Sequence, residues 1–133
     1  GAVVVINGKL PLAPRVFTLA HELKHHLVDQ DENGVACNLS QSSTLVERGA
    51  EEFAAELLLP GELLEREWFA LGIRGGQCPR EGIVRLKAST KTTMSYQALA
   101  ISVERLGLAE PGAFRDVRWF DVQERMLGHR RHY

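Results

Sequence analysis

The sequence has little cysteine and lacks long apolar runs. Only two of its 133 residues are cysteines, Cys37 and Cys78. They lie far apart and form neither a CxxC metal motif nor the framework of a disulfide-rich protein. We therefore expect two free thiols in a reducing cytoplasm. Uninterrupted apolar stretches are short, so the sequence predicts no membrane span, and no secretion signal is recognisable.

The sequence also lacks an excess of basic charge. Its formal net charge is −1 and its pI is about 6.6, which argues against direct nucleic-acid binding. The one basic cluster, His129 to His132 (HRRH), is interpreted as a solvated terminus. Apolar residues make up 44% and charged residues 25%, as is typical of a globular protein. The length fits a single domain over residues 1–133. Because the chain begins with glycine and a strand-like run follows directly, we expect a fragment or a minimal version.

Residue patterning predicts a strand followed by a helix at the start of the chain. Ala2 to Ile6 (AVVVI) is a short β-branched run of the kind found in buried strands. Pro14 suits the first turn of a helix that runs to about Asp29. A polar loop over residues 29–43 follows, with a short strand expected over residues 35–39.

The second half of the chain reads as mostly helical. Helices are predicted over residues 44–59, 62–71, 81–88 and 95–106. Ser95 is a good N-cap for the last of these helices, and Gly107 is its stop signal. The tail over residues 109–133 is hard to assign, although residues 117–122 have the composition of a strand.

The residues with the clearest chemistry are His21, Glu22 and His25, which form an HExxH motif. In a helix, the two histidines lie on one face one turn apart, where both can bind one zinc ion. Glu22 is turned by about 100° from His21 because a helix has 3.6 residues per turn. It can therefore act as general base on a water molecule that the metal activates.

The surroundings of this motif predict a buried helix. One face carries Leu19, Ala20, Leu23 and Leu27, and the other carries Phe17, Thr18, His21, His25 and Val28. A helix with two apolar faces is expected in the interior. Histidines buried there need a partner, and a metal is one. The alternative is a pair of surface histidines that occur together by chance.

A catalytic zinc site takes three protein ligands and leaves one position open. The helix predicted over residues 44–59 offers four candidates: Glu47, Glu51, Glu52 and Glu56. A projection at about 100° per residue places Glu47 on the flank of the apolar face and Glu51 further out on the same side. Glu47 is therefore the predicted third ligand.

A second interpretation of Glu47 is structural. Thr44-x-x-Glu47 fits a capping box, in which the glutamate bonds only to the start of its own helix. A helix that begins earlier, at Ser42 or Ser43, would weaken this interpretation.

Two long segments resemble the ImmA/IrrE family of metallopeptidases. They are RVFTLAHELKHHL, from Arg15 to Leu27, and ERGAEEFAAELLLP, from Glu47 to Pro60. The usual family pattern is R-x-x-F-T-x-A-H-E-L-G-H-x-L-L, then a polar loop, then E-x-E-A-N-x-F-A-A-x-L-L-M-P. SYQALAISVERLGL, from Ser95 to Leu108, resembles the helix after the family's V-S-x-x-A-L segment. The resemblance covers roughly Ala2 to Leu108.

The resemblance implies a zincin-like core of the gluzincin kind. The expected fold class is thus α+β, mostly helical, with a small sheet next to the active-site helix. The implied ligands of a Zn²⁺ ion are His21, His25 and Glu47, with Glu22 as base and Glu51 beside the ligands. Mn²⁺ or Fe²⁺ also suits such a ligand set.

Three positions depart from the family pattern. Lys24 stands where the family usually has glycine, and Gly49 and Glu51 stand where it usually has glutamate and asparagine. Glycine within a helix lowers its stability. A carboxylate in place of an amide at residue 51 changes the charge near the metal.

Members of this family commonly cleave helix-turn-helix repressors of phages, mobile elements or stress regulons. The resemblance therefore implies a cytoplasmic zinc endopeptidase that acts on a protein substrate, without direct contact to nucleic acid or membrane. An oxyanion stabiliser is also required. The sequence offers four candidates for it: Tyr96, His129, His132 and Tyr133.

Two other functions remain open. The chain could be an inactive metal-binding module that regulates a repressor by binding it. It could also be a DNA-associated regulator that uses residues 81–106 as a helix-turn-helix, which would make its DNA binding depend on salt. The oligomeric state is not determined by the sequence.

Overall fold

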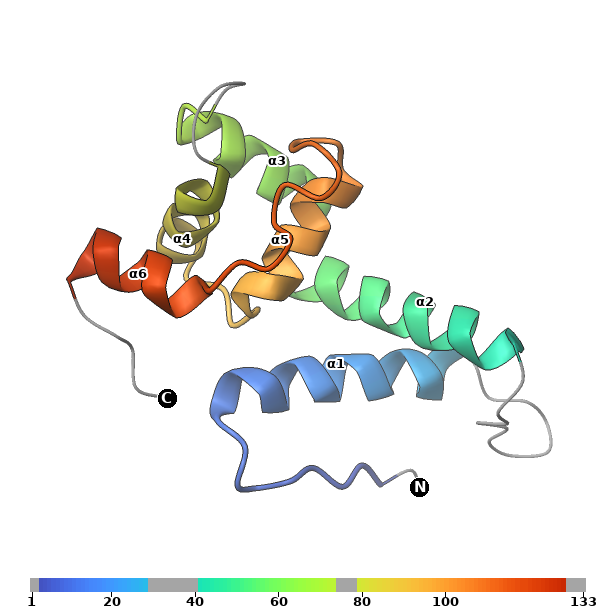
Figure 1. Cartoon of the computed structure of the whole chain (residues 1–133). Helices are drawn as coiled ribbons and strands as arrows, with labels where there is room; N and C mark the ends of the chain where they lie inside the picture. The colour runs from blue at the N-terminus through green and yellow to red at the C-terminus, as the bar shows by residue number, and fades with distance from the viewer. Residues whose placement is uncertain (1–2, 29–40, 74–78, 129–133) are drawn as a thin grey trace.

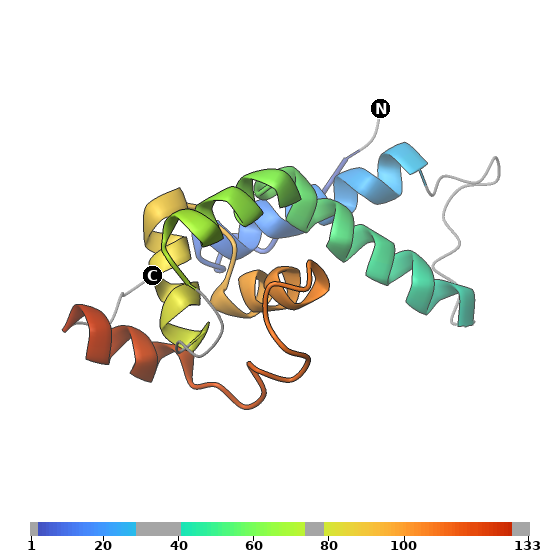
Figure 2. The same cartoon turned by 90° about the horizontal axis from the view of Figure 1, so that it is seen from above.

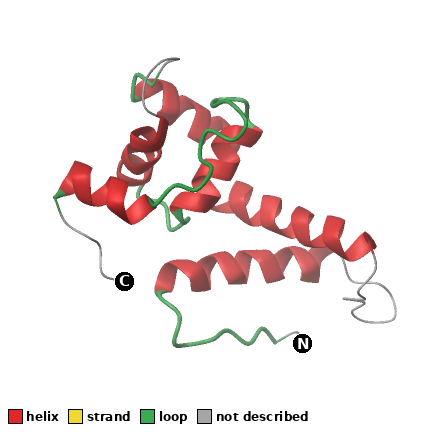
Figure 3. Ribbon diagram, viewed as in Figure 1, coloured by secondary structure: helices red, strands yellow, loops and turns green. Residues whose placement is uncertain are grey.

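The computed structural model describes residues 3–28, 41–73 and 79–128, and these contain helices but no strands (Figures 1 and 3). The described residues form the helices α1 (Leu12–Val28), α2 (Gln41–Leu58), α3 (Gly61–Ala70), α4 (Pro79–Thr90), α5 (Tyr96–Arg105) and α6 (Trp119–Leu127). The prediction of an α+β fold with a small sheet beside the active-site helix is therefore wrong for the described residues. The zincin-like core that the sequence suggested is not confirmed by them.

The expected N-terminal strand is an irregular segment. Residues 3–7 have no regular structure, and the side chains of Val3 and Val5 are 85% and 89% exposed. A β-strand needs a neighbouring strand to pair its backbone groups. The described residues provide no such neighbour, so the β-branched composition alone does not produce a strand.

The tail also differs from its predicted structure. The strand expected over residues 117–122 is replaced by the start of α6, whose residues Trp119 and Val122 are both buried. A spacing of three residues puts them on one helical face, which explains the change from strand to helix. The short strand expected over residues 35–39 lies outside the described residues.

Helices α1 and α2 lie side by side and run in opposite directions (Figures 1 and 2). Three of the small side chains that are buried on the described parts of these helices are Ala20 of α1 and Ala50 and Ala54 of α2. None of them belongs to the main hydrophobic cluster. Small residues let two helix backbones approach closely, which suits the close packing of α1 against α2.

The prediction that α1 is an interior helix is wrong. Ala20 is its only buried residue among those described. Leu19, Leu23 and Leu27 are 51%, 38% and 63% exposed. Helix α1 packs mainly on α2, and no sheet covers its other face in the described part of the chain.

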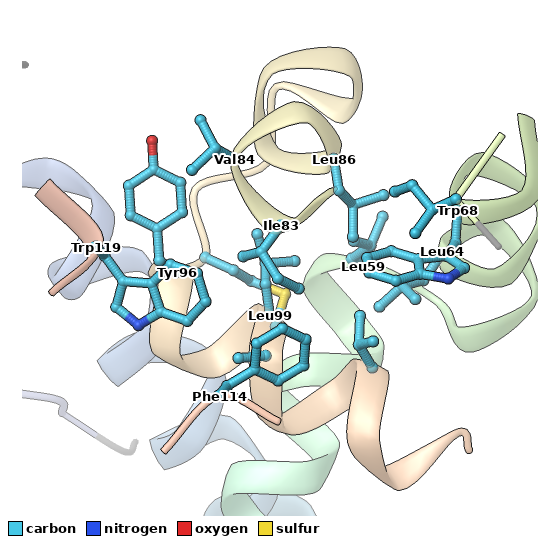
Figure 4. Packing of buried hydrophobic residues seen from close by; sticks show 14 of the residues in the cluster. Leu59, Leu64, Trp68, Ile83, Val84, Leu86, Tyr96, Leu99, Phe114 and Trp119 are labelled. Carbon is cyan, nitrogen blue, oxygen red and sulfur yellow. The ribbon is translucent and has the colours of Figure 1, made fainter. Parts of the chain in front are cut away.

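The main core lies among α3, α4, α5, α6 and the end of α2 (Figure 4). Its fully buried side chains include Leu64, Trp68, Ile83, Leu86 and Leu99. The helices predicted over residues 62–71, 81–88 and 95–106 are confirmed to within a few residues. No described helix is long and apolar enough to cross a membrane.

The predicted ends of α5 are confirmed. The Ser95 hydroxyl accepts a hydrogen bond from the Ala98 amide, as expected of an N-cap. At the other end, Gly107 has a φ of 71°. A residue with a side chain would be strained in this conformation, which explains why glycine ends the helix.

Tyr96 connects α5 to α6 inside this core. Its ring stacks on Trp119 with a centroid distance of 5.8 Å. Its hydroxyl donates a hydrogen bond to the Gln123 side-chain carbonyl, and the residue is only 5% exposed. The Lys87 ammonium lies 5.6 Å from the centre of the same ring. The Tyr96 hydroxyl is therefore occupied by a structural contact.

Replacing Tyr96→Phe tests this structural role. The change leaves the buried Gln123 carbonyl without this donor, which typically costs about 1–3 kcal/mol. We expect the free energy of unfolding, measured by urea denaturation, to fall by that amount. An unfolding curve that coincides with that of the unchanged protein would show that the hydrogen bond contributes nothing.

Candidate metal centre

His21 and His25 stand one turn apart on α1 and face the same point. Their Nε2 atoms are 3.1 Å apart, and the ring centroids are 4.8 Å apart with the planes at 69°. The side chains are only 18% and 17% exposed. This pairing follows from the HExxH spacing, because positions i and i+4 of a helix are neighbours.

Glu47 reaches the two histidines from α2. Its Oε2 atom is 3.1 Å from His21 Nε2, and its Oε1 atom is 3.3 Å from His25 Nε2. Helix α2 begins at Gln41, six residues before Glu47. Glu47 is thus beyond the first turn, and the capping-box interpretation of Thr44-x-x-Glu47 is wrong.

The three side chains fit a bound metal ion. Two ligands at zinc–ligand distances of about 2.0–2.1 Å in a tetrahedral site lie about 3.3–3.4 Å apart. The observed separations of 3.1 to 3.3 Å are close to this value. Within the described residues, this is the one group of three potential ligands whose atoms lie within 4.8 Å of one another. Two imidazoles and a carboxylate suit zinc, manganese or iron.

Glu22 and Glu51 do not belong to this cluster. Glu22 is partly buried on α1, one residue after His21, and its helical position turns it to the side of the ligand face. Glu51 is exposed on α2, one turn after Glu47. The structure gives it no hydrogen bond to the three clustered side chains.

Two of the residues that depart from the family pattern, Lys24 and Gly49, lie next to each other. A Cβ atom added at Gly49 would be 3.4 Å from the Lys24 Nζ atom and 3.6 Å from its Cε atom. The long side chain of Lys24 on α1 therefore lies over the bare backbone of α2 at Gly49. A large side chain at residue 49 would compete with Lys24 for this space.

Of the four candidates for the oxyanion stabiliser, the structure describes only Tyr96. Tyr96 is buried in the core with its hydroxyl bonded to Gln123, so it is not available to a substrate. His129, His132 and Tyr133 lie outside the described residues.

Sequence reasoning missed a groove beside the metal centre. A cavity of about 530 Å³ lies between α2 and α5, and Phe17 of α1 also lines it. Phe17 is four residues before His21, a spacing that places both on one face of α1. That spacing could have identified Phe17 from the sequence. The groove residues of α5 gave no such signal, because their position depends on how α5 packs.

A comparison with protein-family models identifies a family for this chain. The model described as IrrE N-terminal-like domain (Peptidase_M78) matches residues 1–101. The chain belongs to this peptidase family. The match covers the HExxH helix, the helix that carries Glu47 and most of α5. Searches of curated proteins and of solved structures found no match.

Replacing Glu47→Ala should weaken metal binding. Loss of a partner that only orients a ligand already costs 10–100-fold in affinity, so we expect at least a tenfold loss when a ligand itself is removed. Zinc competition with a chromophoric chelator measures this change. Glu51→Ala, one turn further on the same helix, is the control and should bind zinc like the unchanged protein. An equal loss of zinc affinity in both variants would contradict the assignment of Glu47 as a metal ligand.

Replacing Gly49→Ala should stabilise the protein. Alanine favours a helix interior over glycine by about 1 kcal/mol, and the new methyl would meet Lys24 at ordinary contact distance. We expect a gain of about 0.5–1 kcal/mol in the free energy of unfolding, with zinc affinity unchanged. The same substitution at Gly107, where φ is 71°, should instead destabilise the protein. A loss of stability in Gly49→Ala would mean that Lys24 cannot move aside.

Proposed function

We propose that this protein is a zinc-dependent endopeptidase that cleaves a regulatory protein, a helix-turn-helix transcriptional repressor. The observation that carries the proposal is the convergence of His21, His25 and Glu47 on one point from two helices. In a chain of a peptidase family, two such imidazoles and a carboxylate form the usual ligand set of a catalytic zinc site.

The side chains divide the chemical work between them. His21, His25 and Glu47 would hold the ion, which when bound acts as a Lewis acid toward water and a peptide carbonyl. Glu22 lies beside the ligands and outside their cluster, so its carboxylate is free to move protons. It would take a proton from the attacking water and deliver it to the nitrogen of the leaving amine.

The exposure of the site supports an endopeptidase. The Glu47 side chain is 47% exposed, whereas the two histidines are mostly buried. A site of this kind is supported from one side and open on the other. The groove between α2 and α5 is also open, so a continuous polypeptide can enter it without a free end.

A repressor substrate is supported by the family resemblance and by charge. Members of the ImmA/IrrE family commonly act on helix-turn-helix repressors. The net charge of −1 gives this chain no general attraction for DNA, so its partner is expected to be the protein. Such a substrate, together with two cysteines outside any disulfide framework, favours the cytoplasm.

A second function is favoured by one observation. The hydroxyl of Tyr96 is buried in the core and bonded to Gln123, so the one described residue among the four oxyanion candidates does not serve as the donor. A site without such a donor would bind a repressor without cutting it. A stable complex of the two proteins that yields no cleavage product would establish this alternative.

Replacing Glu22→Gln distinguishes these functions. Glutamine is similar in size but cannot accept the proton, so cleavage should fall by at least 10²-fold, the usual contribution of general acid–base catalysis. Zinc content, measured by plasma mass spectrometry, should remain unchanged. Product formation from candidate repressors is followed by mass spectrometry.

Glu62→Gln on α3 makes the same chemical change outside the metal centre and should retain full activity. A Glu22→Gln protein that cleaves at the original rate would overturn the assignment of Glu22 as base. If the zinc-loaded protein cleaves no repressor, the result would favour the alternative function, in which it binds a repressor without cutting it.

A further inference from the structure

The groove between α2 and α5 begins next to the metal centre. Phe17, which lines it, stands one turn before His21 on α1. Glu51, which also lines it, stands one turn after Glu47 on α2. One helical turn is about 5.4 Å, so on both helices the lining of the groove comes within about one turn of the ligands. A peptide with its scissile bond at the metal would place a neighbouring side chain in this groove.

Two matching helical stripes form its walls. The stripe on α2 is Arg48, Glu51, Glu52 and Ala55, and the stripe on α5 is Ala98, Ile101, Ser102 and Arg105. Each has the spacing i, i+3, i+4 and i+7, which defines one face of a helix. One face of α2 and one face of α5 thus lie on opposite sides of a cavity that other described residues do not fill.

The lining combines apolar and charged side chains. Phe17, Ala98 and Ile101 supply apolar surface, and Ile101 is 56% exposed although it is a large aliphatic residue. Phe17, Ser95 and Ala98 also line a second cavity of about 300 Å³, whose lining is mostly apolar. Exposed apolar surface in a concave site is what a bulky apolar side chain would cover.

The charged side chains that line the groove do not form ion pairs with one another. Three carboxylates (Glu51, Glu52 and Glu104) and two guanidinium groups (Arg48 and Arg105) line the groove. Among the described residues, the structure gives none of these five an ion pair. They are available to polar or charged groups of a peptide that flank its apolar side chain.

We infer that the groove between α2 and α5 is the substrate-specificity site and that it takes a bulky apolar side chain close to the scissile bond. Ile101, Phe17 and Ala98 contact that side chain. The charged side chains of the lining bind the more polar residues beside it. The inference rests on the proposed function, because the peptide concerned is the substrate of the metal centre.

The test measures peptide binding separately from cleavage. The zinc-loaded Glu22→Gln protein is immobilised and incubated with a pool of random octapeptides, and the bound fraction is sequenced. We expect leucine, isoleucine, phenylalanine and methionine to be enriched several-fold at one position. Adding Ile101→Trp should remove the enrichment, because the larger ring fills the groove from an exposed position without disturbing the core.

Leu57→Trp is the matched control. Leu57 is an aliphatic helix residue that is 53% exposed, and it does not line the groove. The enrichment should persist in that variant. No enrichment in the Glu22→Gln protein, or an equal enrichment after Ile101→Trp, would overturn the specificity site. If the enrichment is found but the unchanged protein cleaves no peptide, the groove is established and the peptidase function fails.

Discussion

The packing of α1 against α2 is the constraint on which the candidate site depends. The three clustered side chains come from both helices: His21 and His25 from α1, and Glu47 from α2. The separations of 3.1 to 3.3 Å between their side-chain atoms depend on the close packing of α1 against α2, two helices that bury the small residues Ala20, Ala50 and Ala54. The packing of the two helices is therefore as necessary to the metal centre as the ligands themselves.

Local sequence patterns were sufficient to predict most of this site. The HExxH spacing determines how His21 and His25 face each other, because helical geometry alone sets the relation. The projection put Glu47 on the side of its helix that meets the two histidines, because that helix is regular from Gln41 onward. The groove was not predicted, since the positions of Ile101 and its neighbours relative to α2 depend on tertiary packing that no local pattern encodes.

The fold was predicted less completely than the site. The helices of the second half were found because caps such as Ser95 and stop signals such as Gly107 act locally. The strand over Ala2 to Ile6 was predicted from β-branched composition, but a strand is stable only with a paired neighbour. The same missing layer explains why Leu19, Leu23 and Leu27 are exposed when two apolar faces suggested burial.

The separation of the α1–α2 pair from the main hydrophobic cluster affects how a bound ion would act on the protein. An ion on His21, His25 and Glu47 would cross-link two helices whose buried contacts lie mostly outside that cluster. A ligand stabilises only those states in which its site is formed. Its binding free energy would therefore oppose local opening of the pair more than unfolding of α3 to α6. Hydrogen exchange would slow in α1 and α2 before it slows elsewhere.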